Sequence, residues 1–319
     1  MPQAEGSQGQ IIYDAETTYK TDPGTPDCKI LPFKSESLKL SRNVFESEAI
    51  TGSRNPKKPS RGKYDIAGDI ELEINPYIAA ILKHALGSNT TTGASPYTHT
   101  MKVGSLPVGL VIEKGFKDIV QYFKYNGCRI NSLKMSFTPE GMIGGSINVL
   151  GAKETVGATS LDATPTDLGH KPFDAFEMSI QEGGSAIAIV TEADFILENN
   201  LDGSVYVIGG LGERNSLPAG KVKVSGNLKA LFENLTLYNK AKNNTETSLK
   251  ITLSRGDGLG SADNESLEIF VPELLYQPNA PVISGPAGVL VELPFIAYYD
   301  NSTEATTMQM ILKNTQATI

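Results

Sequence analysis

Three histidines and two cysteines are the side chains in this sequence that are best suited to metal binding or acid–base catalysis. A zinc site needs histidines, cysteines or carboxylates at short, regular spacings. His84, His99 and His170 lie far apart in the chain, and no cysteine is near any of them. We therefore expect no metal site and no cofactor, and we expect all three histidines at the surface or at strand edges.

Two further segments match ligand-binding loops only in part. The glycine-rich run at 209–212 follows an apolar stretch, but no Lys-Ser or Lys-Thr pair accompanies it, so a hairpin loop is expected rather than a phosphate site. The acidic stretch 257–265 has oxygen ligands at spacings that differ from the calcium loop of EF-hands, which favours a polar turn. No nucleophile elbow and no H-E-x-x-H pattern occurs. The sequence therefore predicts that the protein is not an enzyme.

The charge of the chain is unevenly distributed. The chain has 319 residues and a formal net charge of −8. Residues 1–165 contain 18 basic and 17 acidic residues, whereas residues 166–319 contain 10 and 19. An acidic protein is poorly suited to binding phosphate backbones, although it could line a passage through which nucleic acid slides.

The cysteine content and the absence of apolar runs indicate a cytosolic protein. Cys28 and Cys128 are too few for a disulfide framework, so two reduced thiols are expected. The first residues are neither basic nor apolar, and no stretch approaches 18 consecutive apolar residues. We expect no signal peptide and no membrane span.

The chain contains an internal repeat with an offset of about 158 residues. SLKLSRNV at 37–44 resembles DFILENNL at 194–201, and the strand-like segment 62–74 resembles 220–232. Gly62 and Gly68 then align with Gly220 and Gly226. The same offset aligns Met135 with Leu293 and Phe137 with Phe295. We expect a first domain at 1–154 with a loose arm at 1–10, a linker at 155–171 and a second domain at 172–319.

Most segments alternate apolar and polar residues with a period of two, which is typical of half-buried strands. One short helix is predicted after Asn75, with Asn75 as its cap, Pro76 in its first turn and Gly87 at its end. A weaker helical segment follows at 235–241. The predicted fold is mainly β, with two tandem antiparallel sandwich or barrel domains and one short flanking helix in each.

Several of these segments resemble the tail tube proteins of long-tailed bacteriophages. The resemblance rests on 31–40, the Arg-bearing loop at 53–62, and 62–76 in the first half. In the second half it rests on PFDAFEMSIQEGGSAIAIVTEADFILENNLDGSVYVIGG at 172–210, GKVKVSGNLKALF and the closing VLVELPFIAYYD. The tube protein of the type VI secretion system is a related, single-domain protein. A virion-decorating or carbohydrate-binding β-sandwich protein is the alternative, but its aromatic residues should cluster on one face, and here they are scattered.

The resemblance implies a self-assembling structural protein of the virion. Six domains would close a ring through their inner strands, so three copies of a two-domain chain would suffice. The rings would stack into a hollow tube between a tail tip complex and a terminator protein. Phage DNA would pass through the lumen without specific binding, and assembly would occur in the host cytoplasm.

Two sets of charged residues are candidates for contacts in such a tube. The loop 43–62 has two prolines and is expected to be extended. It is either a solvated loop or a contact to an acidic surface of a neighbouring ring through Arg54, Lys57, Lys58 and Arg61. The polar faces of two strands either line the lumen or meet at a seam between domains. These faces carry Asp65, Asp69, Glu71 and Glu73 in one strand, and Lys221, Lys223 and Lys229 in the other.

Overall fold

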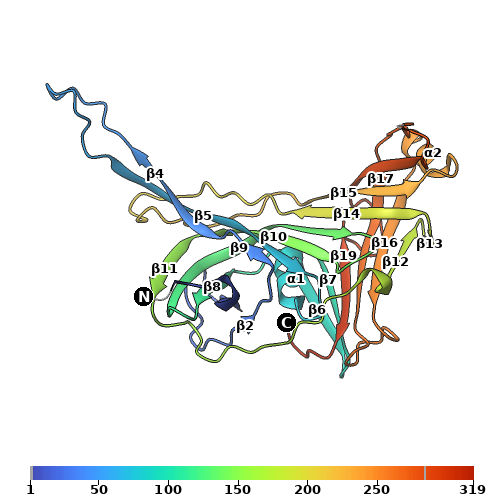
Figure 1. Cartoon of the computed structure of the whole chain (residues 1–319), viewed down its shortest axis with the longest axis horizontal. Coiled ribbons are helices and arrows are strands. Elements are labelled where there is room, and N and C mark those ends of the chain that lie inside the picture. The colour runs from blue at the N-terminus through green and yellow to red at the C-terminus, as the bar shows by residue number, and fades with distance from the viewer. Residues whose placement is uncertain (1–2, 284) are drawn as a thin grey trace.

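Antiparallel strands make up most of the computed structural model, which describes residues 3–283 and 285–319 (Figure 1). The first half contains β1 (Gly9–Ala15), β2 (Lys29–Ile30), β3 (Ser35–Glu36), β4 (Lys39–Phe45), β5 (Ser60–Glu73), α1 (Ala79–Leu86), β6 (Gly87–Gly93), β7 (Tyr97–Val103), β8 (Leu110–Phe116), β9 (Gln121–Phe137), β10 (Gly144–Gly151) and β11 (Lys153–Gly157). The second half contains β12 (Met178–Glu182), β13 (Ser185–Ala186), β14 (Val190–Glu198), β15 (Lys223–Leu231), α2 (Thr236–Lys242), β16 (Thr247–Ser254), β17 (Ser266–Tyr276), β18 (Leu290–Ala297) and β19 (Gln309–Asn314). Single 3-10 turns precede β1 (Gly6–Gln8) and β12 (Ala175–Glu177). The mainly β fold with two short helices is confirmed.

One sheet runs through both halves of the chain, and we call it the central sheet. Its strands lie in the order β4, β5, β10, β9, β14, β15 and β18. The halves join where β9 pairs with β14, for example Leu133 with Leu197 and Met135 with Phe195. Phe137 stacks on Phe195 across this junction, with ring centroids 6.0 Å apart. The two halves therefore share one sheet and one hydrophobic core.

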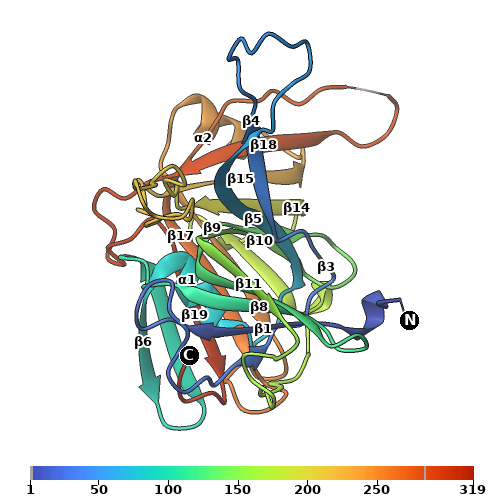
Figure 2. The same ribbon diagram turned by 90° about the vertical axis from the view of Figure 1, so that its left-hand side faces the viewer.

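A second layer covers one face of the central sheet in each half (Figure 2). In the first half it consists of β2, β1, β8, β9 and β11, and in the second half of β13, β12, β16, β17, β19, β7 and β6. The long strands β9 and β17 pair in both layers, which places their apolar side chains between the two sheets. β9 is irregular at Gly127, whose φ of +65° suits glycine at a bulge.

The strands of the two halves correspond closely. β5 and β15 occupy matching places, because Ile66 pairs with Leu40 and Gly151 in the same way that Val224 pairs with Leu197 and Ala297. The alignments of 37–44 with 194–201 and of 62–74 with 220–232 therefore agree with the strand register.

The proposed match of Met135 and Phe137 with Leu293 and Phe295 is wrong. Met135 and Phe137 lie in β9, whereas Leu293 and Phe295 lie in β18, which pairs with β15 as β10 pairs with β5. β18 is thus the counterpart of β10. Its residues are 146 positions later in the sequence, as Ala297 opposite Val224 corresponds to Gly151 opposite Ile66. Two neighbouring antiparallel strands with the same alternation cannot be told apart by periodicity alone.

Both predicted helices are present, but α1 begins later than expected. Asn75 does not cap it; its side chain accepts a hydrogen bond from the Tyr77 amide in the turn that leads to the helix. Gly87 ends α1 with a φ of +108°. The buried residues of α1 include Ile81, Leu82 and Ala85 from the predicted apolar stripe, so the helix packs on the core as its pattern indicates.

The hairpin of β6 and β7 crosses from the first half to the second. It follows α1 in the chain, but β7 pairs with β19, joining Met101 to Met310. The second half has no strand pair at the matching place after α2, where β16 follows at once. The expected loose arm at 1–10 is shorter than predicted, since Gly9 and Gln10 pair with β8, and Met1 and Pro2 lie outside the described residues.

Candidate interaction surfaces

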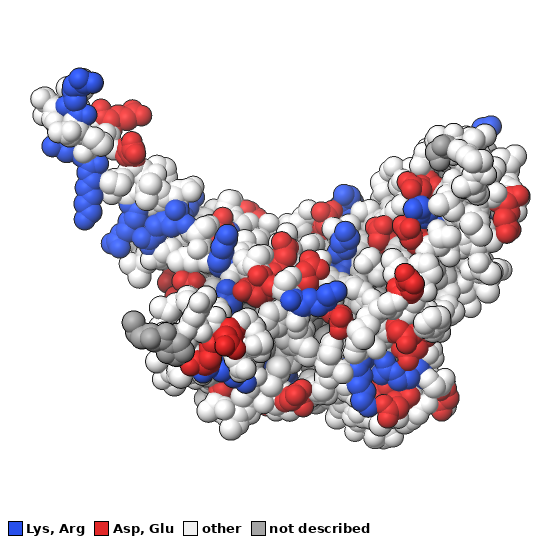
Figure 3. Space-filling view, in the orientation of Figure 1, with Lys and Arg blue, Asp and Glu red and all other residues white. Residues whose placement is uncertain are grey.

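A basic arm projects from the molecule between β4 and β5. It consists of residues 46–59 and extends far beyond the body of the protein (Figure 1). Of the predicted contact residues, Arg54, Lys57 and Lys58 lie on the arm and Arg61 lies next to it in β5. All four are exposed, and basic side chains gather along the arm and at its base (Figure 3). Ile50 on the arm is fully exposed, as are large parts of the β4 residues Val44 and Phe45 next to it. Such an arm has both charge and apolar surface with which to contact another molecule.

The corresponding loop of the second half, residues 199–222, lies across the first half instead. The Tyr64 amide donates a hydrogen bond to the Gly212 carbonyl (2.8 Å), and the Tyr206 hydroxyl donates to the Tyr64 carbonyl (2.7 Å). The ammonium group of Lys63 lies 4.4 Å from the centre of the Tyr206 ring. The glycine-rich run at 209–212 is part of this docked loop and forms turns within it.

Arg214 holds this loop in place. Its guanidinium donates to the carbonyl oxygens of Ile66 (2.6 Å) and Gly151 (2.7 Å) in the first half and of Gly203 (2.9 Å) within the loop, and it pairs with Asp65. The Arg214 residue is only 5% exposed. A planar guanidinium with several donors can satisfy that many acceptors at once, which a lysine could not do. The sequence gives no sign that this arginine is buried while Arg54, in the matching loop, is exposed.

The predicted charged strand faces lie on the exposed side of the central sheet. Asp65, Asp69, Glu71 and Glu73 alternate along β5 with buried residues, as expected. β5 and β15 are separated by β10, β9 and β14. The interpretation that these two strands meet at a seam is therefore wrong within the chain, because each already has a neighbour on both sides.

Lysines on this face pair with carboxylates on β14 rather than with those on β5. Lys223 contacts Glu198 and Lys229 contacts Glu192, each at 3.1 Å. Lys221 is exposed just before β15. Acidic side chains slightly outnumber basic ones on this face, which carries Asp65, Asp69, Glu71, Glu73, Glu192, Asp194, Glu198 and Glu292 against Lys39, Lys63, Arg129, Lys134, Lys221, Lys223 and Lys229.

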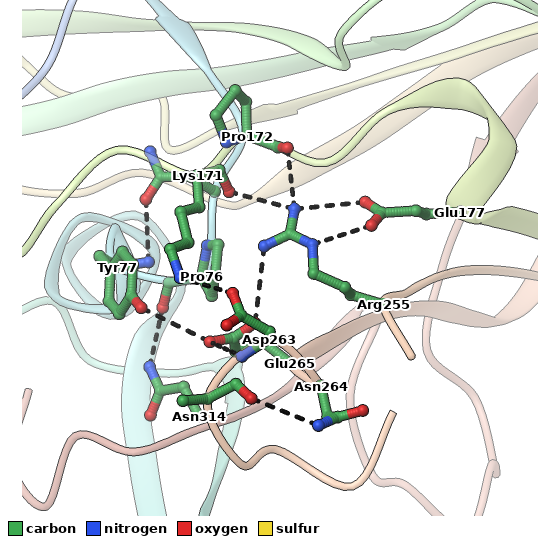
Figure 4. Close-up of polar contacts among 12 residues, drawn as sticks. Pro76, Tyr77, Lys171, Pro172, Glu177, Arg255, Asp263, Asn264, Glu265 and Asn314 are labelled. Carbon is green, nitrogen blue, oxygen red and sulfur yellow. Dashed lines mark hydrogen bonds and ion pairs between the residues drawn. The ribbon is translucent and has the colours of Figure 1, made fainter. Parts of the chain in front are cut away.

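A partly buried polar cluster connects Lys171, at the end of the linker, to Arg255 and Asp263 of the second half (Figure 4). Arg255 contacts Glu177 at 2.8 Å and Glu265 at 3.5 Å, and it also donates to the Pro172 carbonyl. Tyr77, from the turn before α1, reaches Glu265, which is fully buried. The acidic stretch 257–265 therefore forms a polar turn, in which Asp263 pairs with Lys171 and Glu265 with Arg255, while Asp257 accepts a hydrogen bond from the Leu259 amide.

Two of the histidines are buried, which contradicts the expected surface placement. His84 lies on the inner side of α1, where burial lowers its pKa to about 4. His99 is fully buried, with its ring nitrogens near Thr91 and Asn314. His170 is at the surface and contacts Glu73 at 2.9 Å. Within residues 3–283 and 285–319, neither buried ring forms an ion pair with a carboxylate, which is consistent with packing roles in the interior.

The cysteines are buried free thiols. Burial raises the pKa of the Cys28 thiol to about 12 and also raises the pKa of Cys128. Thiols with raised pKa values are poor nucleophiles at neutral pH. Among the residues that the structure describes, no three metal-ligating side chains come together, and neither short helix is long enough to cross a membrane.

A family model described as phage tail tube protein matches residues 6–297, which is most of the chain. No curated protein matches the chain.

Proposed function

Because the chain belongs to the phage tail tube protein family, we propose that it assembles with copies of itself into stacked rings that form the hollow tube of a phage tail. A tail tube protein is a structural component of the virion. The observation that carries the proposal is the central sheet, which continues from one half into the other and whose end strands are only partly paired among the residues that the structure describes. A sheet built this way can be extended by further copies until it closes on itself.

Each half supplies one tube domain in this proposal. The first domain comprises residues 1–154 and the second 172–319, with 155–171 as the linker. The matching strand pairs of β5 and β15 support it. Three chains then supply six domains, so the ring is a trimer with pseudo-sixfold symmetry.

The exposed face of the central sheet lines the lumen in this proposal. Its small excess of carboxylates supports a wall that does not attract phosphate. Attraction of about 1 kcal/mol at each basic contact, repeated along the tube, would hold DNA back. Phage DNA therefore passes without specific binding, and the protein acts as a conduit rather than an enzyme.

The basic arm contacts a neighbouring ring. Its length and its exposed Arg54, Lys57, Lys58 and Arg61 support this role, and the acidic second half offers partner carboxylates. Tail tip and terminator proteins bind the two ends of the stack, and assembly takes place in the host cytoplasm before the virion is released.

Electron microscopy tests the proposal directly. Purified protein, concentrated and imaged in negative stain, is expected to form hollow tubes of uniform width. Discrete particles or monomers under all assembly conditions would argue against a tube protein. A tube map with three copies in each ring supports the trimer, and six copies would rule it out.

A further inference from the structure

The central sheet has two ends, and both lack a partner strand in the described chain. At one end, β4 pairs only with β5. At the other end, β17 pairs with β18 as far as Tyr276, and the Gln277 amide then donates to the Pro294 carbonyl at 2.7 Å. Residues 277–283 follow Tyr276 without belonging to a strand. We call this the 277–283 segment.

The junction of β9 and β14 within the chain shows how two such ends fit together. Residues 132–137 of β9 pair on one side with β10 and on the other side with β14. In this junction Lys134 is opposite Ile196, and Leu133 is opposite Leu197. The stacked pair of Phe137 and Phe195 seals the core beneath it.

The register assigns the 277–283 segment the place that residues 132–137 have in the first half. Ile130 pairs with Val149 of β10, and Tyr276 pairs with Phe295 of β18, the counterpart of Val149. Continuing from these pairs, and allowing for the bulge in β9, Asn279 corresponds to Lys134 and Val282 to Phe137. Phe137 is 1% exposed, whereas Val282 is 75% exposed. Val282 thus has the position of a core residue but lacks the neighbour that would cover it.

The missing neighbour is the counterpart of β14, and that counterpart is β4. Lys39 corresponds to Ile196, since Lys39 pairs with Ala67 of β5 as Ile196 pairs with Ser225 of β15. Within one chain β4 lies at the opposite end of the central sheet from the 277–283 segment. Only a second copy of the chain can bring β4 to it.

We infer that the 277–283 segment forms a strand against β4 of a second copy, with Asn279 opposite Lys39, Pro278 opposite Leu40 and Gln277 opposite Ser41. This inference rests on the proposed function, because it assigns the residues at which neighbouring chains of a ring join. Pro278 and Pro281 have no amide hydrogen, so this junction has fewer backbone hydrogen bonds than that of β9 and β14. The charged residues Lys134 and Asp194 of the β9–β14 junction correspond to the uncharged Asn279 and Ser37 here. The junction between copies should therefore be weaker than the junction of β9 and β14 within the chain.

A disulfide crosslink tests the register. The double variant Lys39→Cys/Asn279→Cys is assembled under reducing conditions, oxidised and analysed by non-reducing electrophoresis. Both positions are exposed, and the native cysteines are buried and do not interfere. We expect covalent products of two and three chains and loss of most of the single chain.

Lys39→Cys/Glu292→Cys is the matched control. Glu292 lies on β18, one strand further from the proposed partner, so its Cα would be about 10 Å from that of residue 39. A disulfide requires Cα atoms within about 7 Å, so this pair should not crosslink. Equal crosslinking of both pairs, or tubes of Lys39→Cys/Asn279→Cys without covalent products, would overturn the inference while leaving the tube intact. Failure of the unaltered chain to form tubes would instead overturn the proposed function.

Hydrogen exchange gives a second measurement that needs no substitution. In the isolated chain the backbone amides of 39–45 and 277–283 that lack partners should exchange rapidly, and in tubes their exchange should slow at least tenfold. Unchanged exchange of both segments on assembly contradicts the inference, even if a cysteine variant fails to assemble.

Discussion

The arm between β4 and β5 and the loop between β14 and β15 have the same place in the two halves, but their surroundings differ. At the base of each, a glycine faces an asparagine: a Cβ on Gly62 would lie 2.7 Å from the carbonyl oxygen of Asn43, and a Cβ on Gly220 would lie 2.7 Å from that of Asn200. Beyond these shared bases, the loop lies across the first half, whereas the arm projects away from the chain (Figure 1). The loop has its neighbouring domain within the same chain, and the arm does not. This difference supports the proposal that the arm contacts a surface of another copy.

The largest expected effect distinguishes Arg214 from Arg54. Arg214→Ala should lower the free energy of unfolding by about 3 kcal/mol, because it leaves buried carbonyl oxygens without donors. Arg54→Ala should leave it unchanged, since Arg54 is exposed. Denaturant titration of the unassembled chain measures both values. Similar losses in the two variants would mean that the arm is not free in solution.

The two halves should also differ in how their stability depends on pH. All three histidines precede residue 171, so a histidine effect on the free energy of unfolding must come from the first half or the linker. Burial lowers the pKa of His84 to about 4, below the value of about 6.5 in an unfolded chain. The unfolded state therefore binds more protons as the pH falls below 6.5, and this part of the stability is lost with falling pH. Between pH 6.5 and 5 we expect a loss on the order of 2 kcal/mol.

His84→Gln should flatten this pH dependence, as followed by denaturant titrations at several pH values. His170→Gln is the control, because His170 is at the surface and should leave the slope near that of the unaltered chain. An unchanged slope in His84→Gln would show that another group causes the pH dependence.

Substitution of the two matching glycines tests how similar the loop bases are. Gly62→Ala and Gly220→Ala each place a Cβ against a backbone oxygen, so each should lower the free energy of unfolding by about 1 kcal/mol. Gly157→Ala is the control, because no atom lies within 4 Å of its Cβ. Thermal and chemical unfolding of the three variants measure these changes. A loss of stability in only one of Gly62→Ala and Gly220→Ala would show that the two loop bases are not equivalent.

The smallest effect on stability is expected for the arm itself. Lys57→Glu combined with Lys58→Glu should leave unfolding unchanged, because both residues are exposed. The same variant should slow tube formation severalfold, since each contact of about 0–1 kcal/mol recurs at every ring. Light scattering during assembly follows the rate, with Lys57→Arg/Lys58→Arg as the charge-preserving control. Normal assembly of the charge-reversed variant would remove these lysines from the contact.

The sequence predicted the elements of the fold better than their partners. The alternation in β5 and the helical pattern of α1 depend on local burial, which has a readable period. The pairing of β7 with β19 joins residues about two hundred positions apart, and nothing in either strand specifies the other. The mistaken match of Phe137 with Phe295 has the same origin, since alternation identifies a strand but not its place in the sheet.

The charged residues show the same limit. The exposed faces of β5 and β15 were correctly separated from their buried faces. Arg54 and Arg214 each precede an asparagine in the connection between two matching strands, but only Arg214 has the edges of β5 and β10 within reach. Whether such an arginine is buried depends on which domain lies next to its loop, and that is a property of the assembly rather than of the local sequence.

The pairing of β7 with β19 also orders events during synthesis. The hairpin of β6 and β7 leaves the ribosome early, but the strand that it pairs with, Gln309–Asn314, is made more than two hundred residues later. Until then one edge of β7 is unpaired, and unpaired strand edges promote aggregation with other chains. The outer layer of the second half therefore closes only when translation is almost finished, so a chain that stops early cannot present a complete domain to a growing tube.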